Sequence, residues 1–117
     1  MTNITTNILL CAIMLVESGG NPLVWNYKED ALGPLQIRPV FVDDVNRIVG
    51  RSAFTYDDRR SVLKSMNMAV IYFQHYGEGK TPQDLARMFN GGPDGWKEET
   101  TLPYWEKVKT QIEKFYE

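Results

Sequence analysis

The sequence contains few of the residue types on which many catalytic and metal sites depend. It has one cysteine, Cys11, so no disulfide can form within the chain. It also has one histidine, His75, which argues against a histidine-based metal site and against a serine–histidine–aspartate triad. Residues 77–81 have the wrong spacing for a phosphate-binding loop. We therefore expect no metal ion and no other cofactor.

Strong charge of either sign is lacking as well. The 117 residues carry 13 basic and 15 acidic side chains, a formal net charge of −2. No basic cluster exceeds the pair Arg59-Arg60, so nothing indicates a nucleic-acid surface. The longest apolar run, Ile8–Val16, is much shorter than the roughly 20 residues of a membrane span. We expect a monomer with no nucleic-acid partner and no membrane insertion.

The sequence shows no export signal either. A signal peptide begins with a positively charged region, but no Lys or Arg precedes Lys28, and no small-residue cleavage site follows the apolar run. We therefore interpret residues 8–16 as part of a core helix. A chain of this length supports one hydrophobic core, so we expect a single domain over residues 1–117.

Apolar residues recur with a helical period through most of the chain, which predicts an all-α domain of about five helices. The expected helices cover about residues 5–18, 39–48, 57 or 58–76, 81–90 and 102–116. Residues 21–37, rich in Pro, Gly, Asn and aromatic residues, are predicted to be a loop with a short hairpin. The inward stripes of the third and last helices are predicted to be Val62, Met66, Ala69, Val70 and Phe73, and Leu102, Trp105, Val108, Ile112 and Phe115.

Glu17 is the first charged residue of the chain and follows the apolar run directly. Gly19 and Gly20 come next, and glycines readily adopt the left-handed backbone that ends a helix. In the last turn of a helix, the negative end of the helix dipole and apolar neighbours both disfavour a carboxylate anion. Such a carboxyl group keeps its proton near neutral pH, as a general acid requires. The alternative is a solvated side chain beside a helix end.

Two later segments also combine glycines with isolated polar residues. Residues 31–39, Ala-Leu-Gly-Pro-Leu-Gln-Ile-Arg-Pro, hold a single amide, Gln36, which could hydrogen-bond a neutral polar ligand such as a sugar. Residues 86–92 end a predicted helix with Asn90 and two glycines, where a ligand can approach the backbone closely.

In this order and spacing the segments resemble one known family. Glu-Ser-Gly-Gly-Asn-Pro at 17–22, Gly-Pro-Leu-Gln-Ile-Arg-Pro at 33–39, Phe-Asn-Gly-Gly at 89–92 and Glu-Thr ahead of Tyr104 look like the soluble lytic transglycosylase and goose-type lysozyme group. The resemblance covers roughly residues 8–110. It implies a lysozyme-like fold, peptidoglycan strands as the partner, and cleavage of their β-1,4 bond between MurNAc and GlcNAc.

The resemblance also assigns roles to individual positions. Glu17 matches the catalytic acid of the family. The positions that match its substrate-binding residues are Ser18, Gly33, Leu35, Gln36, Ile37, Phe89, Asn90 and Tyr104. Of these, Tyr104 matches a tyrosine on the last helix that contacts the catalytic Glu. The chain departs from the family pattern in three places. Pro34-Leu35 replaces Leu-Met, Phe89 replaces a tyrosine, and an extra residue precedes Tyr104.

Three activities remain open at this point. In lytic transglycosylases one Glu acts as acid and base while the MurNAc 6-hydroxyl closes a 1,6-anhydro ring, and this internal nucleophile needs no second carboxylate. Lysozyme-type hydrolysis uses two carboxylates, and Glu29 and Asp30 are the candidates for the second. A non-catalytic glycan-binding module would need no acid. We predict the lytic transglycosylase, with Glu17 as its acid and base.

The biological setting follows as an expectation. An enzyme of this kind acts on the cell wall, in the periplasm or outside the cell. A chain without an export signal suits a bacteriophage endolysin, released from the host cytoplasm or carried in a virion. It equally suits an excised catalytic domain of an exported bacterial enzyme.

Overall fold

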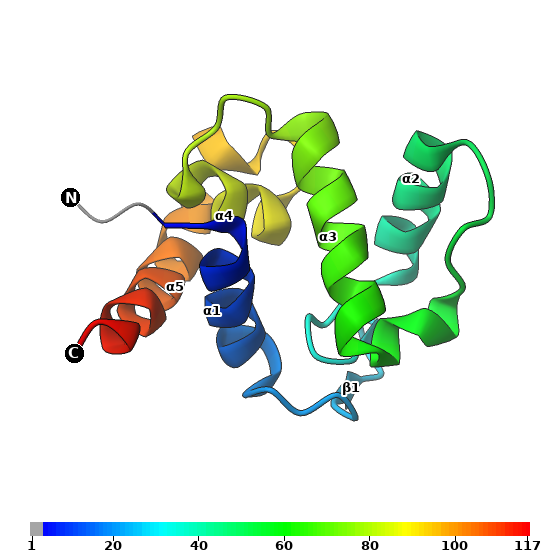
Figure 1. Ribbon diagram of the computed structural model, residues 1–117, viewed down its shortest axis with the longest axis horizontal. Coiled ribbons are helices and arrows are strands. Elements are labelled where there is room, and N and C mark those ends of the chain that lie inside the picture. The colour runs from blue at the N-terminus through cyan, green and yellow to red at the C-terminus, as the bar shows by residue number, and fades with distance from the viewer. Residues whose placement is uncertain (1–3) are drawn as a thin grey trace.

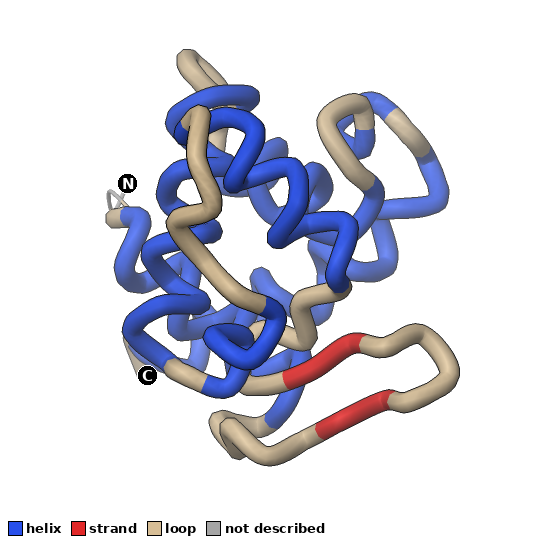
Figure 2. The backbone as a smooth tube through the Cα atoms, turned by 90° about the vertical axis from the view of Figure 1, so that its right-hand side faces the viewer, coloured by secondary structure: helices blue, strands red, loops and turns tan. Residues whose placement is uncertain are grey.

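The computed structural model describes residues 4–117, so residues 1–3 of the predicted domain lie outside the described part. This part contains five α-helices: α1 (Thr6–Ser18), α2 (Pro39–Val49), α3 (Val62–Tyr76), α4 (Pro82–Gly91) and α5 (Leu102–Phe115) (Figure 1). Strands β1 (Trp25–Asn26) and β2 (Ala31–Leu32) form an antiparallel hairpin that projects from the helices (Figure 2). The predicted architecture is confirmed. Three short 3-10 turns complete it: η1 (Tyr56–Arg60), η2 (Gly95–Lys97) and η3 (Glu99–Thr101).

Local sequence signals explain where α1 and α4 begin and end. Thr5 caps the start of α1, and Gly19, with φ of 66°, ends it in the left-handed conformation. Thr81 and Asp84 form a capping box at the start of α4, where Pro82 takes the first helical position. Both helices therefore lie within a residue or two of their predicted bounds.

The prediction for the third helix is wrong in its first turns. The turn η1 comes first, and Ser61 then caps a separate helix α3. Val62, predicted to face inward, is 39% exposed, whereas Ser65 is fully buried. A serine can occupy the core here because its hydroxyl donates a hydrogen bond of 2.9 Å to the carbonyl of Arg59. A pattern of hydrophobic residues cannot reveal a buried polar residue of this kind, whose hydroxyl is hydrogen-bonded within the core.

The prediction for the last helix holds in the middle and fails at the ends. Val108 and Ile112 of α5 are buried, but Leu102 and Phe115 are 40% and 44% exposed. These two residues are the first and the last of α5, and their side chains remain in contact with solvent.

Helix α1 packs against α3, α4 and α5, while α2 packs against α3 on the other side (Figure 1). The buried residues of all five helices, together with Leu35 and Ile37 from the segment after β2, form one continuous core. Cys11, a free cysteine in α1, is only half-buried. The end of α1, the hairpin, α2, α3 and the end of α4 all contribute residues to one cleft.

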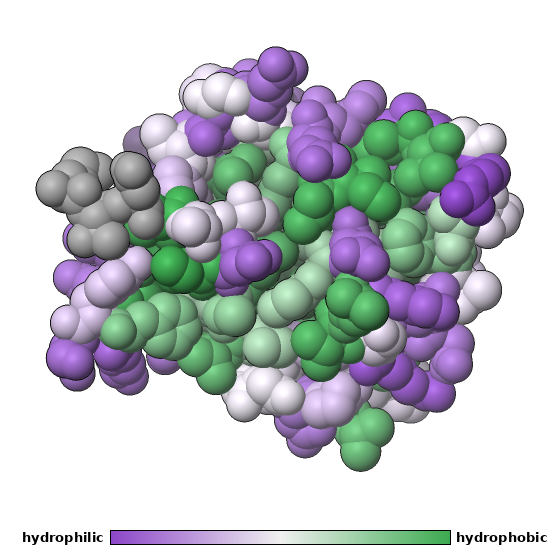
Figure 3. Space-filling model, viewed as in Figure 1, coloured by the Kyte–Doolittle hydropathy of each residue, from purple (hydrophilic) through white to green (hydrophobic). Residues whose placement is uncertain are grey.

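The surface is mixed in polarity. Figure 3 shows apolar residues spread over one face of the molecule, with hydrophilic residues gathered mainly toward its edges. Within residues 4–117, no helix has both the length and the apolar character required to cross a lipid bilayer.

Candidate active site

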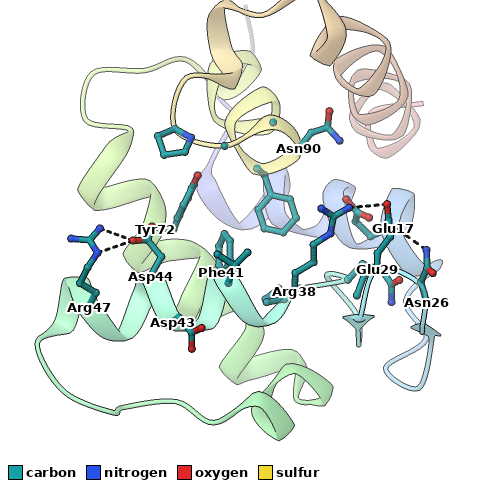
Figure 4. A pocket seen from close by; sticks show the side chains of 18 residues that line it. Glu17, Asn26, Glu29, Arg38, Phe41, Asp43, Asp44, Arg47, Tyr72 and Asn90 are labelled. Atoms are coloured by element: carbon teal, nitrogen blue, oxygen red, sulfur yellow. Dashed lines mark hydrogen bonds and ion pairs between the residues drawn. The ribbon is translucent and has the colours of Figure 1, made fainter.

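Glu17 lies in the last turn of α1, where Gly19 ends the helix at the edge of a cleft (Figure 4). Its carboxylate Oε2 accepts a hydrogen bond of 2.7 Å from the hydroxyl of Tyr104, which comes from α5. Tyr104 is the tyrosine predicted by resemblance to accompany the acid. The structure thus brings together two residues that are far apart in the sequence and fixes the orientation of the Glu17 carboxyl group.

Burial raises the pKa of Glu17 above its ordinary value of 4.5, because a carboxylate anion loses solvation in this position. The hydrogen bond from Tyr104 opposes the shift, as do the charges of Arg38 and Lys107. The negative charge of Glu29 adds to it. The net result is a carboxyl group that holds its proton at a higher pH than an exposed glutamate, which suits a general acid.

A stability measurement tests this burial independently of any activity. Above the raised pKa, the ionised carboxylate disfavours the folded state, whereas below about 4.5 both states are protonated and the penalty is absent. We therefore expect Glu17→Gln to increase the free energy of unfolding near pH 7. The gain should shrink as the pH falls toward the unfolded-state pKa. Urea unfolding at several pH values measures it, and a gain that does not vary with pH would contradict the expectation.

Ser18 joins the end of α1 to the segment after β2. Its hydroxyl donates a hydrogen bond of 2.7 Å to the carbonyl of Pro34 and accepts one of 3.1 Å from the N–H of Gly20. Because these bonds commit the hydroxyl to the backbone and Ser18 does not line the cleft, its observed contacts are structural. The predicted contact of Ser18 with substrate stays a prediction.

Gln36 lines the cleft, but its amide nitrogen is already engaged. Nε2 donates hydrogen bonds of 2.8 Å to the carbonyl of Val24 and 3.0 Å to that of Gly33. These bonds hold Gln36 at a φ of 51°, a left-handed conformation that is uncommon for a residue other than glycine. With both amide protons used, Gln36 can offer a ligand only the acceptor oxygen Oε1.

The remaining residues of the 33–37 motif divide between cleft and core. Ile37 lines the cleft, whereas Leu35 is fully buried and belongs to the hydrophobic core. Gly33 packs against the backbone of Arg59 and does not line the cleft. The motif therefore builds the wall behind Glu17 more than it presents groups to a ligand.

The cleft has a volume of about 850 Å³ and extends across α2 and α3. Phe89 and Asn90, two of the predicted substrate-binding residues, lie at the end of α4 and line the cleft. Figure 4 shows two separate polar groups along it. The near end is defined as Glu17, Asn26, Glu29 and Arg38, and the far end as Asp43, Asp44, Arg47 and Tyr72.

The two candidates for a second carboxylate differ in position. Glu29 lines the near end of the cleft, where Oε1 forms an ion pair of 2.9 Å with Arg38. Asp30 does not line the cleft, and its carboxylate lies 3.4 Å from the buried guanidinium of Arg59. Of the two, only Glu29 is placed to act on a ligand beside Glu17.

Sequence reasoning missed Arg38, Phe41 and the whole far end of the cleft. Arg38 stands in the Gln-Ile-Arg-Pro segment, and a positive charge next to that motif was the available signal. The sequence gave no such signal for Tyr72 and Asp44, because a tyrosine in an apolar stripe and an acidic residue on a helix are both common. Within residues 4–117, no three His, Cys, Asp or Glu side chains form a group that could hold a metal ion.

Fold and site together define a lysozyme-like domain with a half-buried glutamate, Glu17, at the end of a helix beside a long cleft. Residues 2–110 match the family described as "Transglycosylase SLT domain". The chain belongs to this family, and its predicted lysozyme-like fold is confirmed.

The chain is also similar to a curated protein named Lysozyme 1 from Crassostrea virginica. The two are 26% identical over 113 residues, which is 94% of this chain and 61% of the relative. The chain thus spans about 61% of the length of the relative it matches.

Proposed function

We propose that this domain is a lytic transglycosylase that cleaves the β-1,4 bond between MurNAc and GlcNAc and leaves 1,6-anhydroMurNAc ends. The observation that carries the proposal is the half-buried Glu17 side chain at the cleft, whose carboxyl group is oriented by the Tyr104 hydroxyl and has a raised pKa. One such group suffices when the nucleophile belongs to the substrate itself.

The proposed reaction uses Glu17 twice. Its protonated carboxyl group first gives a proton to the bridging oxygen as the bond to MurNAc C1 breaks, and the GlcNAc leaves with a free 4-hydroxyl. The carboxylate then removes the proton from the MurNAc 6-hydroxyl, whose oxygen bonds to C1. Glu17 ends protonated and ready for another turnover. Tyr104 supports the anionic stage because its hydroxyl donates to Oε2.

The surroundings of Glu29 favour this route over hydrolysis. A general base must accept a proton from water, but the Glu29 carboxylate faces the guanidinium of Arg38 at 2.9 Å. That ion pair engages Oε1, and the side-chain amide of Asn26 donates a hydrogen bond of 3.4 Å to Oε2, so both carboxylate oxygens already have partners in the protein. Glu29 still lies on the cleft, and the similar protein is named a lysozyme, so hydrolysis by Glu17 with Glu29 is the second candidate.

Product analysis combined with Glu29→Gln separates the two candidates. We expect mass spectrometry of digested peptidoglycan to show 1,6-anhydro ends. We also expect Glu29→Gln to keep the rate of strand cleavage within about threefold, since the amide removes a base that the reaction does not use. Reducing ends together with a loss of about 10²-fold or more in the variant would instead establish the two-carboxylate hydrolase.

The proposal also concerns where the domain acts and in what oligomeric state. We propose that the domain acts as a monomer on peptidoglycan in the cell wall, in the periplasm or outside the cell. The bacteriophage origin stays a prediction from the sequence.

A further inference from the structure

The β1–β2 hairpin, which projects from the helices in Figure 2, has two different faces. Asn26 pairs with Ala31 across the hairpin, and both residues line the cleft. Successive side chains of a strand point to opposite faces, so Trp25 points away from the cleft. Tyr27 lies beside it, with ring centroids 6.2 Å apart in an edge-to-face arrangement. These two residues are 58% and 70% exposed and do not line the cleft, and we call them the hairpin outer face.

The Trp25 ring is held in place although it is exposed. Its indole Nε1 donates a hydrogen bond of 3.0 Å to the carboxylate of Asp30. Asp30 in turn lies 3.4 Å from the buried guanidinium of Arg59, which also donates to the Asp30 carbonyl at 2.7 Å. A buried cation thus fixes the acid that fixes the indole. Because a ring that is already ordered loses little side-chain entropy on binding, this arrangement favours contact with a partner.

The acidic side chains of the hairpin are both paired. Glu29 forms its ion pair with Arg38, and Asp30 lies against Arg59. Within residues 4–117, Lys28 takes part in none of the ion pairs, so a single positive charge is left in the turn of the hairpin. The hairpin outer face is therefore aromatic and close to neutral.

This combination fits sugar rings better than it fits protein or lipid. A stable interface between two protein copies buries about 800 Å² on each side, whereas an aromatic side chain buries at most about 250 Å². An anionic lipid surface attracts clusters of about four to eight basic residues, and Lys28 is a single one. A pyranose needs no charge. The carbon-bound hydrogens on one side of its ring pack against an aromatic face, while the hydroxyls at its edge stay in water.

We infer that the hairpin outer face is a wall-attachment surface, separate from the cleft, on which Trp25 and Tyr27 stack against sugar rings of a neighbouring glycan strand. The inference rests on the proposed function for the identity of the polymer, since a cell wall presents many strands side by side. One strand occupies the cleft and is cut, and the opposite face of the hairpin contacts another. This contact retains the enzyme on an insoluble substrate and takes no part in bond cleavage.

Co-sedimentation with purified insoluble sacculi tests the inference, and the Glu17→Gln background prevents digestion during the measurement. Trp25→Ala combined with Tyr27→Ala should weaken binding about tenfold, the loss of two aromatic contacts. Leu63→Ala is the matched control, because it removes an apolar side chain that is 71% exposed on α3 and outside the cleft. It should bind as the parent does. Equal binding by the parent and the double variant would overturn the inference.

Tyr27→Ala alone keeps the test independent of any change in the hairpin. This substitution leaves the hydrogen bond between Trp25 and Asp30 intact, and it should still weaken binding about threefold. Circular dichroism checks that each variant is folded. Unchanged binding by the single variant, with the loss confined to the double variant, would attribute the effect to a disturbed hairpin and would also overturn the inference.

Turnover with Glu17 present separates attachment from catalysis. The double variant should release fragments from sacculi more slowly but keep the wild-type kcat and KM for a soluble GlcNAc–MurNAc hexasaccharide. An equal loss on the soluble glycan would overturn the inference, because the rings would then act within the cleft. Sacculus binding that is unaffected while binding to phosphatidylglycerol vesicles is lost would identify a lipid partner instead. If the wild type is retained on sacculi through these rings but cleaves neither substrate, the proposed function fails and the attachment surface stands.

Discussion

The Glu17→Gln variant is expected to fold normally and to lose peptidoglycan cleavage by about 10²- to 10⁴-fold. The amide has nearly the shape of the carboxylic acid and keeps an oxygen that can accept the hydrogen bond from Tyr104. It cannot donate a proton to the bridging oxygen of the glycan or later take one from the 6-hydroxyl. Both proposed steps therefore fail at once, which is why this substitution has the largest expected effect on activity.

Clearing of a peptidoglycan suspension measures the effect, and circular dichroism confirms the fold. Glu113→Gln is the matched control, because Glu113 is exposed on α5 and outside the cleft. It should clear the suspension at the wild-type rate. Persistent clearing by Glu17→Gln would show that another group supplies the proton. Binding without clearing in the wild type would instead identify a glycan-binding module.

Much of the fold was predictable because its helices are defined by short-range signals. Thr5, Gly19 and the Thr81–Asp84 capping box each interact only with residues a few positions away. Their effect on the helix ends can therefore be read from the sequence alone. The separation of η1 from α3 was not predictable from periodicity. Ser61 leaves the helical conformation and caps α3, and the buried Ser65 hydroxyl bonds to the carbonyl of Arg59, a contact that forms only when the chain has folded.

The candidate site divides in a similar way. Glu17 could be found from its place between an apolar run and two glycines, and resemblance added Tyr104. The engagement of the Gln36 amide by Val24 and Gly33 was invisible, because sequence shows that an amide is present but not which of its atoms are free. Tyr72 was hidden for the opposite reason. Its ring belongs to a buried stripe, and only the three-dimensional cleft reveals where its hydroxyl points.

Gly33→Ala is expected to reduce the free energy of unfolding by more than about 4 kcal/mol, a large part of the stability of a small domain. Gly33 has a φ of 85°, and an added Cβ would lie 1.8 Å from the carbonyl oxygen of Arg59. That oxygen cannot move away easily. The Arg59 guanidinium donates to the carbonyls of Asp30 at 2.7 Å and Ile37 at 3.0 Å, which holds η1 against the hairpin.

Gly50→Ala is a closely matched control for the backbone strain alone. Gly50 ends α2 with a φ of 88°, and nothing lies within 4 Å of an added Cβ. The Gly50→Ala variant should lose only about 1–2 kcal/mol of its free energy of unfolding, the cost of placing alanine in the left-handed conformation. Denaturant unfolding of both variants therefore isolates the contact between Gly33 and Arg59. Similar losses in the two proteins would mean that the segment shifts to accommodate the methyl group. In that case the wall formed by residues 33–37 behind Glu17 is less rigid than its hydrogen bonds indicate.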